Sequence, residues 1–446
     1  MKDVYKILCI NPGSTSTKLA IFENEKMLNE VNIEHRSEDL AQYKDIIGQL
    51  PLRKAAIDAY LAEQGLKPSE LDAIAARGCP SGHRYHAGAY AIDADMMEAC
   101  MQPVNAVHPM CLAPVIAYEW VKEYHIPAYC YDVVMTDEMD DVAKVTSLPE
   151  IKRGAAAHML NTRAVAIEVA EQAGTTYDKV NYIMCHLGGG ISVSMHKHGR
   201  VVDMVSSGEG TFTPSRAGMF GNYDMIRLCF SGKYTAKSLR DLFQDHSGFV
   251  AYFGTSDCRE VERMVEAGDP QAKLIYDAFI YNIAKDIGTM AVTTSGEVDA
   301  IVLTGGIAYS KILTDAVRKR VSFIAPVVVR PGAIEMDALA RGILPRTPGR
   351  RGLPYVRRGI LTGKGKFHMK TLVMLSNHHV HLTDEACHAL FGDKGLTFAR
   401  YLAEEGGPWS SNELVEVRGP KGTLGRFRVL GPVSYTHLTL PTNREV

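Results

Sequence analysis

The sequence predicts an α/β protein with two related halves, followed by a partial β-rich segment. Strand-like apolar runs alternate with helix-spaced runs up to about residue 341, which is the pattern of an α/β protein. Two segments, which start near residues 5 and 182, repeat one layout of strand, short tip and strand. After residue 341, arginine, glycine and proline dominate and the periodicity ends, as expected of a linker.

Each repeated segment is expected to form a hairpin whose tip binds phosphate. The tips are residues 11–18 and 188–192, which are rich in glycine and hydroxyl side chains. Such residues let backbone N–H and side-chain O–H groups approach a phosphate closely. Neither tip is a Walker A loop, because no GxxxxGK[ST] occurs. Two matching tips predict two halves that hold one polyphosphate between them, and Gly305 and Gly306, which follow a third buried strand, support this prediction.

The remaining elements follow from apolar spacing and from glycine stops. In chain order, we expect helical spacing at 38–65, a strand at 71–76, helices at 96–100, 111–124, 158–173 and 274–294, a strand at 298–304 and a closing helix at 334–341. The expected domains are residues 1–150 and 151–340, whose final helix is able to pack on the first domain, then a linker at 341–366, a truncated domain at 367–432 and a tail at 433–446.

Length, charge and cysteine usage fit a cytoplasmic enzyme. The 446 residues suffice for about two to three domains. A net charge of −2 and a pI of about 6.8 favour neither nucleic acid nor a membrane surface as partner. The nine cysteines contain no CxxC pair and are interpreted as reduced residues, several of them in the core. No leader pattern and no apolar run of membrane-spanning length is apparent, so a cytoplasmic location is expected.

Four motifs together resemble the acetate and butyrate kinase family, and its butyrate kinases most of all. The resemblance covers about residues 4–341. It implies duplicated ribonuclease-H-like domains around a cleft, as in actin, Hsp70 and sugar kinases. It also implies a homo-oligomer that uses Mg²⁺ and reversibly transfers a phosphoryl group between ATP and a short-chain carboxylate, giving ADP and an acyl phosphate. The motifs are Asn11-Pro12-Gly13-Ser14-Thr15-Ser16-Thr17-Lys18, Cys185-His186-Leu187-Gly188-Gly189-Gly190-Ile191-Ser192, Pro214-Ser215-Arg216-Ala217-Gly218 and Leu303-Thr304-Gly305-Gly306-Ile307.

The resemblance assigns roles to individual residues. Phosphoryl transfer to a carboxylate brings two anions together, so cationic clamps and positioning supply most of the catalysis. By resemblance, the clamps are Arg77, which also binds the substrate, and Arg216, while Asn11, Asp132 and Glu335 orient the phosphoryl group, with Glu335 at the Mg²⁺. The implied ATP and phosphate contacts are Gly13, Ser14, Thr15, Ser16, Lys18, His186, Gly188, Gly189, Gly190, Gly305 and Gly306. Taken alone, Lys18 is also compatible with a solvated surface lysine, and His186 with a satisfied core histidine.

One departure from acetate kinases concerns the substrate. Where those enzymes have Phe-His-Gly-Thr-Ser-His, residues 157–162 read Ala-His-Met-Leu-Asn-Thr, so only His158 carries over as a substrate-binding residue. Butyrate kinases resemble the chain better at this place and in the segment 82–88 after Arg77. A longer aliphatic acid, straight or branched, is therefore favoured over acetate.

A second resemblance begins after the linker. Residues 375–383 and 417–432 resemble the start of the zinc-dependent phosphate propanoyltransferase family, which makes His379 and His381 vestigial zinc ligands without the family's further ligands. Residues from about 433 match neither family and resemble translated library-adapter sequence. The linker fits either a natural fusion of two pathway enzymes or a reading-frame slip between adjacent genes.

Three functions from different classes stay open at this point. The first is a carboxylate kinase. The second is an actin-like or Hsp70-like ATP-driven binding protein, although such proteins usually begin the first phosphate loop with Asp rather than with Asn11. The third is a phosphate acyltransferase that works through the C-terminal segment.

Overall fold

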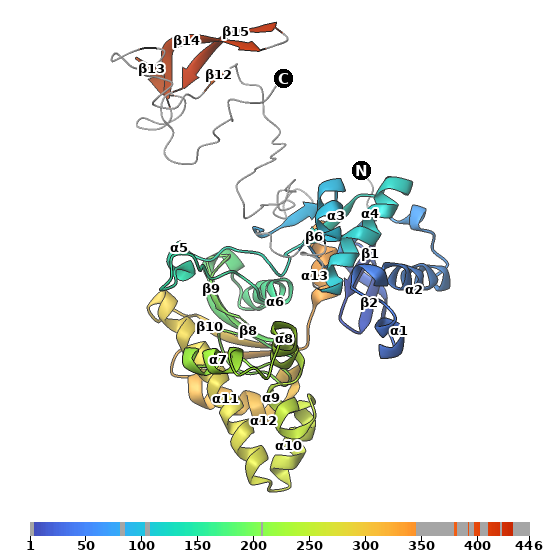
Figure 1. Cartoon of the computed structure of the whole chain (residues 1–446), viewed down its shortest axis with the longest axis vertical. Helices are drawn as coiled ribbons and strands as arrows, with labels where there is room; N and C mark the ends of the chain where they lie inside the picture. Colours follow the sequence, from blue (N-terminus) through green and yellow to red (C-terminus); the bar gives the residue numbers. More distant parts are fainter. Residues whose placement is uncertain are drawn as a thin grey trace. The chain divides into compact units, whose positions relative to one another are not determined.

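The protein consists of two compact units, Met1–Met369 and Lys370–Val446. The structure, a computed structural model, describes residues 4–80, 85–102, 108–206 and 208–344 of the first unit (Figure 1). In the second unit it describes residues 379–380, 391, 397–401, 409–419 and 422–430. Among the described residues, no helix combines the length and the apolar character that crossing a bilayer requires.

The first half of the large unit is built on a six-stranded sheet in the order β3-β2-β1-β4-β6-β5. Strand β1 runs antiparallel to β2 and parallel to β4, and β4 runs parallel to β6. The carboxyl ends of β1, β4 and β6 therefore meet at one edge, where open α/β sheets place ligands. The strands are β1 (Lys6–Pro12), β2 (Ser16–Glu23), β3 (Lys26–Glu34), β4 (Ala73–Ala76), β5 (Ala89–Ala91) and β6 (Ala128–Tyr131).

Helices α2 and α4 cover one face of this sheet and bury the side chains of Leu8 and Ile10. The expected helical region 38–65 is interrupted: Asp45 accepts a hydrogen bond from the Gly48 backbone N–H, and α2 starts only where Pro51 occupies its first turn, which the missing N–H of proline tolerates. The helices of this half are α1 (Ser37–Ala41), η1 (Ile47–Gln49), α2 (Leu50–Glu63), η2 (Pro68–Glu70), α3 (Ala94–Met101), η3 (Pro109–Cys111) and α4 (Leu112–Tyr124).

The second half repeats the plan with a five-stranded sheet in the order β11-β10-β7-β8-β9. Its β7–β8 hairpin and the β1–β2 hairpin confirm the two predicted hairpins. The strands are β7 (Asn181–Leu187), β8 (Ile191–Lys197), β9 (Arg200–Val205), β10 (Ala300–Gly305) and β11 (Val327–Pro331). The helices are α5 (Asp141–Lys144), α6 (Met159–Gln172), η4 (Tyr177–Lys179), α7 (Asn222–Cys229), α8 (Ala236–Asp245), α9 (Gly248–Phe253), α10 (Cys258–Glu266), α11 (Pro270–Ala291), η5 (Val292–Thr294), η6 (Gly306–Tyr309), α12 (Lys311–Val321) and α13 (Glu335–Ile343).

Two helices connect the halves and position the site. Helix α6 packs on β7 and β10 of the second sheet, whereas α13, which follows the second sheet in the chain, packs on β1, β2, β4 and β6 of the first. Figure 1 shows the orange α13 beside the blue strands, and α13 also contacts α6. Helix α13 continues to Ile343, which is buried against the first sheet, so the predicted linker cannot begin at residue 341.

The C-terminal unit contains a four-stranded sheet in the order β12-β15-β14-β13. Its strands are β12 (His379–Val380), β13 (Phe398–Tyr401), β14 (Trp409–Gly419) and β15 (Gly422–Leu430). Of the two predicted zinc ligands, His379 lies in β12 and His381 lies outside the described residues, as does the predicted tail at 433–446. The zinc site therefore stays a prediction.

Candidate active site

Three predicted site residues meet at the carboxyl ends of β1 and β4. Asn11 lies near the end of β1, on the face that α13 covers, and Arg77 follows β4 with its backbone N–H bonded to the Ile10 carbonyl at 2.8 Å. Glu335 is the first residue of α13. Its carboxylate accepts a hydrogen bond from Asn11 Nδ2 at 3.0 Å and lies 3.0 Å from Arg77 Nη2, while Arg77 Nη1 donates to Asn11 Oδ1 at 3.2 Å.

This triad holds the guanidinium group of Arg77 in place. Glu335 and Asn11 use both terminal nitrogens of Arg77, and the side chains of Arg77 and Glu335 are 19% and 18% exposed. The Arg77 Nε donor is buried without a hydrogen-bond partner in the described structure. Asn11 and Glu335 thus fix the orientation of the Arg77 guanidinium, and its predicted binding of an anion stays a proposal.

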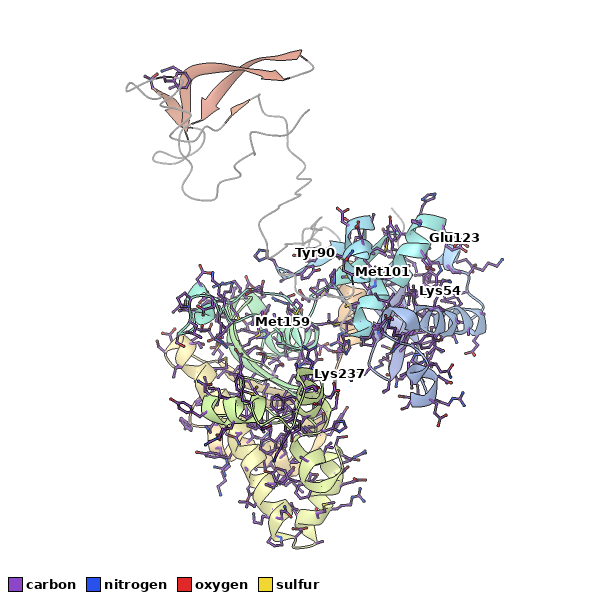
Figure 2. The ribbon with its side chains drawn as sticks, in the orientation of Figure 1. Lys54, Tyr90, Met101, Glu123, Met159 and Lys237 are labelled. Atoms are coloured by element: carbon purple, nitrogen blue, oxygen red, sulfur yellow. The ribbon has the colours of Figure 1, made fainter. Side chains whose placement is uncertain are left out.

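Two predicted histidines stack in the second half. The rings of His158 and His186 lie parallel, with centroids 3.9 Å apart. His158 comes just before α6, whose first residue, Met159, is labelled in Figure 2. Ser192 Oγ on β8 lies 3.0 Å from His158 Nδ1, so both sides of the second hairpin contribute to the stack.

The hydrogen bonds of Asn161 define the tautomer of His186. The Oδ1 atom of Asn161 accepts from the Ile334 backbone N–H at 3.0 Å, which leaves Nδ2 to donate to His186 Nδ1 at 3.0 Å and to Thr304 Oγ1 at 3.3 Å. In a neutral imidazole the other nitrogen, Nε2, then carries the proton. A Cβ atom built at Gly188 would stand 3.3 Å from this Nε2, so the N–H donor lies at the glycine tip.

Arg216 reaches the same tip from the following loop. Thr213 Oγ1 donates to the Gly189 carbonyl at 2.7 Å and accepts from the Arg216 backbone N–H at 3.0 Å. A Cβ atom built at Gly190 would lie 3.0 Å from Arg216 Nη1 and 3.4 Å from His158 Cε1. Glycine at this position therefore allows Arg216 and His158 to lie against the tip.

Burial keeps the two stacked histidines uncharged. It lowers the pKa of His186 to about 4, with Glu335 opposing and Arg77 adding to the effect. It also holds the pKa of His158 well below its usual value, with His186, Arg77 and Arg216 adding to the effect. The site thus combines two arginines with two neutral imidazoles, a combination suited to polyphosphate and carboxylate ligands.

We expect the stability of the protein to fall as the pH drops below about 6.5. Burial holds the pKa of His196 well below 6.5, as it does for His186. Since the unfolded chain binds a proton on each histidine near pH 6.5 and the folded chain does not, each one lowers the free energy of unfolding by up to about 1.4 kcal/mol per pH unit between 6.5 and its folded pKa. Guanidinium unfolding at pH 7.5, 6.5 and 5.5 measures this slope.

The matched variant is His196→Gln. His196 lies in the second sheet within hydrogen-bond distance of Tyr177 Oη and Ser194 Oγ, and glutamine replaces it with a neutral hydrogen-bonding group. Below pH 6.5, the free energy of unfolding of the variant should therefore change less steeply with pH than that of the wild type, by the contribution of one histidine. An unchanged slope would contradict the account.

The tip of the first hairpin is accessible. Gly13 donates to the Ser16 carbonyl at 2.8 Å and closes the turn, and Ser14 and Thr15 at its apex are exposed. Lys18 forms an ion pair with Glu30 on β3 at 2.8 Å and is 37% exposed. The structure therefore pairs Lys18 with a carboxylate, and its predicted phosphate contact stays a proposal.

The two glycines after β10 differ in their surroundings. Gly305 has a φ of +91°, and a Cβ atom there would lie 2.3 Å from the Leu187 carbonyl oxygen, so glycine is required for the close approach of β10 to β7. Gly306 is exposed, and a Cβ atom there would meet nothing within 4 Å. Of these two glycines, Gly306 is the one with open space around its Cα.

Asp132 is held by other partners. Its side chain is 1% exposed, lies 3.0 Å from Arg163 Nε, and accepts a hydrogen bond from the Gly88 backbone N–H at 2.9 Å. Arg163 on α6 also contacts Glu138 at 2.6 Å. In this structure the carboxylate of Asp132 thus belongs to a buried ion-pair network between β6 and α6, and its predicted catalytic role stays a proposal.

Several residues that build the site were not among the predicted ones. Asn161 lies three positions after His158, at helical spacing on α6, so the same face of the predicted helix could have been expected to carry both side chains. Thr213 stands next to the predicted Ser-Arg-Ala-Gly turn. Ser192 lies in the predicted tip 188–192 but was assigned no role of its own, and Arg53 carries no local signal for its contact with the hairpin, whose residues are distant in sequence.

The Mg²⁺ that the resemblance implies fits the donors at this site. Within the described ranges, no group of three or more His, Cys, Asp or Glu side chains could hold a metal. Mg²⁺ in phosphoryl-transfer sites is bound by one or two carboxylates together with phosphate oxygens and water. Glu335, whose two carboxylate oxygens contact Asn11 and Arg77 in this structure, is the residue that would hold Mg²⁺ together with the phosphates of ATP, and this role stays a proposal.

Comparisons with known proteins show which family the chain belongs to. Residues 150–324 match the model of the Acetokinase family, and residues 372–438 match that of Phosphate propanoyltransferase. The second match extends to residue 438, so the prediction that residues from about 433 match neither family is wrong for residues 433–438. The chain is 41% identical to Butyrate kinase 2 of Clostridium acetobutylicum and 42% identical to Probable butyrate kinase 2 of Caldanaerobacter subterraneus subsp. tengcongensis, in each case over 76% of this chain and 96% of the relative.

Solved structures confirm the predicted fold class. Acetate kinase from Porphyromonas gingivalis superposes with a TM-score of 0.63 at 20% identity, over 75% of this chain and 98% of that one. A propionate kinase from Francisella tularensis subsp. tularensis gives a TM-score of 0.63 at 17% identity, over 76% and 98% of the two chains.

Proposed function

Because this chain belongs to the acetokinase family and is a carboxylate kinase, we propose that its acceptor is butyrate or a branched short-chain fatty acid. The observation that carries the choice of acceptor is the departure of the Ala157 to Thr162 segment from acetate kinases, while the residues that would bind the two anions are Arg77, Asn11 and Glu335 at one sheet edge and Arg216 with two neutral histidines at the second glycine tip. Cations and neutral donors in this arrangement suit a carboxylate and a polyphosphate.

The reaction is an in-line displacement between two anions. A carboxylate oxygen attacks the γ-phosphorus of ATP, the new O–P bond forms, and the bond to the β-phosphate oxygen breaks as ADP leaves. Arg77 binds the carboxylate and Arg216 offsets the charge on the equatorial oxygens. The Nε2–H of His186 and the backbone N–H groups of the two tips orient the phosphates. Glu335 would hold Mg²⁺, which would supply neutralisation of the phosphate charge.

The expected substrate preference is butyrate or isobutyrate over acetate. It rests on the Ala157 to Thr162 segment, which departs from acetate kinases, and on the relatives named butyrate kinase. Hydroxamate trapping of the acyl phosphate measures kcat/KM for each acid. A preference for acetate of about tenfold or more, roughly 1.4 kcal/mol, would contradict the assignment.

We further propose a cytoplasmic homo-oligomer. Helix α7 buries none of its residues and exposes Tyr223 at 80% and Ile226 at 52%, followed by Phe230 at 85%. An apolar face of this kind favours association with a second copy. Light scattering that gave the mass of a single 49.0 kDa chain at micromolar concentration would contradict the oligomer.

The C-terminal unit is proposed to be silent in the kinase reaction. Contacts within the site described above come from residues 11–335, all in the first unit. Truncation after residue 345 is therefore expected to leave kinase activity within about twofold, since a terminus tolerates removal when no buried backbone depends on it. The readout is the hydroxamate assay on both proteins.

The acyltransferase alternative has its own test. The match of residues 372–438 to Phosphate propanoyltransferase supports asking whether the full chain releases CoA from butyryl-CoA in a phosphate-dependent reaction. Such release, abolished by His379→Ala, would contradict the proposal that the C-terminal unit is silent and would make the protein bifunctional.

A further inference from the structure

Arg53, on helix α2, donates hydrogen bonds to the tip of the first hairpin, residues 11–18. Its side chain is 0% exposed. Nη2 donates to the Ser14 carbonyl at 3.1 Å, and Nη1 donates to the Ser16 carbonyl at 3.0 Å and to Thr17 Oγ1 at 3.1 Å. The remaining N–H groups donate to Gln49 Oε1. All five donors of the guanidinium are thus used, three of them on the hairpin.

These bonds determine which way the tip's peptide groups point. The carbonyls of Ser14 and Ser16 accept from Arg53, and that of Thr15 accepts from the His35 backbone N–H at 2.8 Å. In a trans peptide the C=O and the following N–H point in opposite directions. The Thr15 N–H therefore points away from Arg53, at an exposed apex, and no described residue accepts a hydrogen bond from it.

Arg53 also carries an uncompensated charge. Its hydrogen-bond partners are carbonyl, amide and hydroxyl oxygens, and no carboxylate among the described residues forms an ion pair with it. Burial lowers its pKa to about 10, which still leaves it protonated at neutral pH. A buried cation is costly without an anion nearby. A polyphosphate bound at the exposed face of the tip would bring an anion toward this charge.

We propose that Arg53 is the positioning residue of the first phosphate tip: it turns the tip carbonyls inward, so that the Thr15 N–H faces the nucleotide phosphates, and its charge attracts them. The inference rests on the proposed use of ATP. It adds a residue that has no contact with the ligand and acts through the backbone of Ser14, Thr15 and Ser16.

The test compares Arg53→Gln with the wild type in two calorimetric titrations, with MgATP and with adenosine, in the absence of carboxylate. Glutamine removes the positive charge and most of the N–H donors of the guanidinium group. We expect MgATP affinity to fall about tenfold or more while adenosine affinity stays within about twofold, because adenosine has no phosphate for the tip. The matched control is Lys54→Gln, on the adjacent residue labelled in Figure 2, which pairs with Asp58 and should change neither affinity.

Steady-state kinetics supply a second readout with Arg53→Lys. An ammonium group keeps the charge but cannot donate to two carbonyls and a hydroxyl in the same fork geometry. We expect kcat/KM for ATP to fall threefold or more with KM for butyrate unchanged. Unchanged ATP kinetics in Arg53→Lys, or equal loss of MgATP and adenosine binding in Arg53→Gln, would overturn the inference.

Failure of the proposed function is distinguishable from failure of this inference. If the wild type binds MgATP but forms no acyl phosphate, the carboxylate-kinase proposal fails, while the two titrations still decide the role of Arg53. If the wild type forms butyryl phosphate and Arg53→Gln binds MgATP as tightly as the wild type does, only the Arg53 inference fails.

Discussion

Replacing Arg77 or Arg216 by alanine is expected to lower kcat for acyl phosphate formation about 10²-fold or more, since each removes a cation at the position where charge develops in the transition state. Arg77 joins Asn11 and Glu335 through two separate nitrogens. The single ammonium group of lysine cannot replace two separate guanidinium nitrogens. The kcat of Arg77→Lys should therefore be nearly as low as that of Arg77→Ala. The measurement is kcat by hydroxamate trapping, with circular dichroism to confirm the fold.

Arg36→Ala is the matched control for the two clamps. Arg36 is 76% exposed and pairs only with its neighbour Asp39 at the surface, so its removal should leave kcat unchanged. Turnover at the wild-type rate in both clamp variants would show that the site lies elsewhere.

The second large effect is expected in stability. Arg163→Met should lower the free energy of unfolding by about 3–5 kcal/mol, because it leaves the buried carboxylate of Asp132 and the partly buried carboxylate of Glu138 without their cation. Denaturant titration at neutral pH measures the difference. The variant also tests whether Asp132 acts in the reaction or supports the junction of β6 with α6.

The control for Arg163 is an exposed pair from the same half. Arg200 and Asp140 form an ion pair with side chains 50% and 45% exposed. Arg200→Met should therefore cost less than about 1 kcal/mol. If both variants lose the same free energy of unfolding, burial of the Arg163 ion pairs does not increase their contribution to stability.

The hairpins and most of the site could be predicted from the sequence, because both are encoded locally. Glycine and hydroxyl residues at two strand ends predict the tips, and the resemblance assigned Arg77 and Arg216 as clamps and Asn11, Asp132 and Glu335 as residues that orient the phosphoryl group. The face that each residue occupies follows from strand alternation: Asn11 shares the α13 side of β1 with Ile7 and Cys9.

What escaped prediction depends on contacts between distant residues. Asp132 resembles a catalytic carboxylate in sequence, yet its partner Arg163 lies thirty-one positions further along, and nothing near either residue reveals the pair. Arg53 looks like one charged position on a surface helix until the fold places it behind the tip. Helix α7 was not predicted either, since it buries none of its residues and so lacks a core-facing stripe.

The most direct test of the central claim is ³¹P NMR of the wild-type protein with ATP, Mg²⁺ and butyrate. The account predicts that ADP and an acyl phosphate resonance grow together and that both disappear when Arg216 is replaced by alanine. Release of ADP with inorganic phosphate alone, at the same rate with and without butyrate, would contradict it and favour an ATP-driven binding protein.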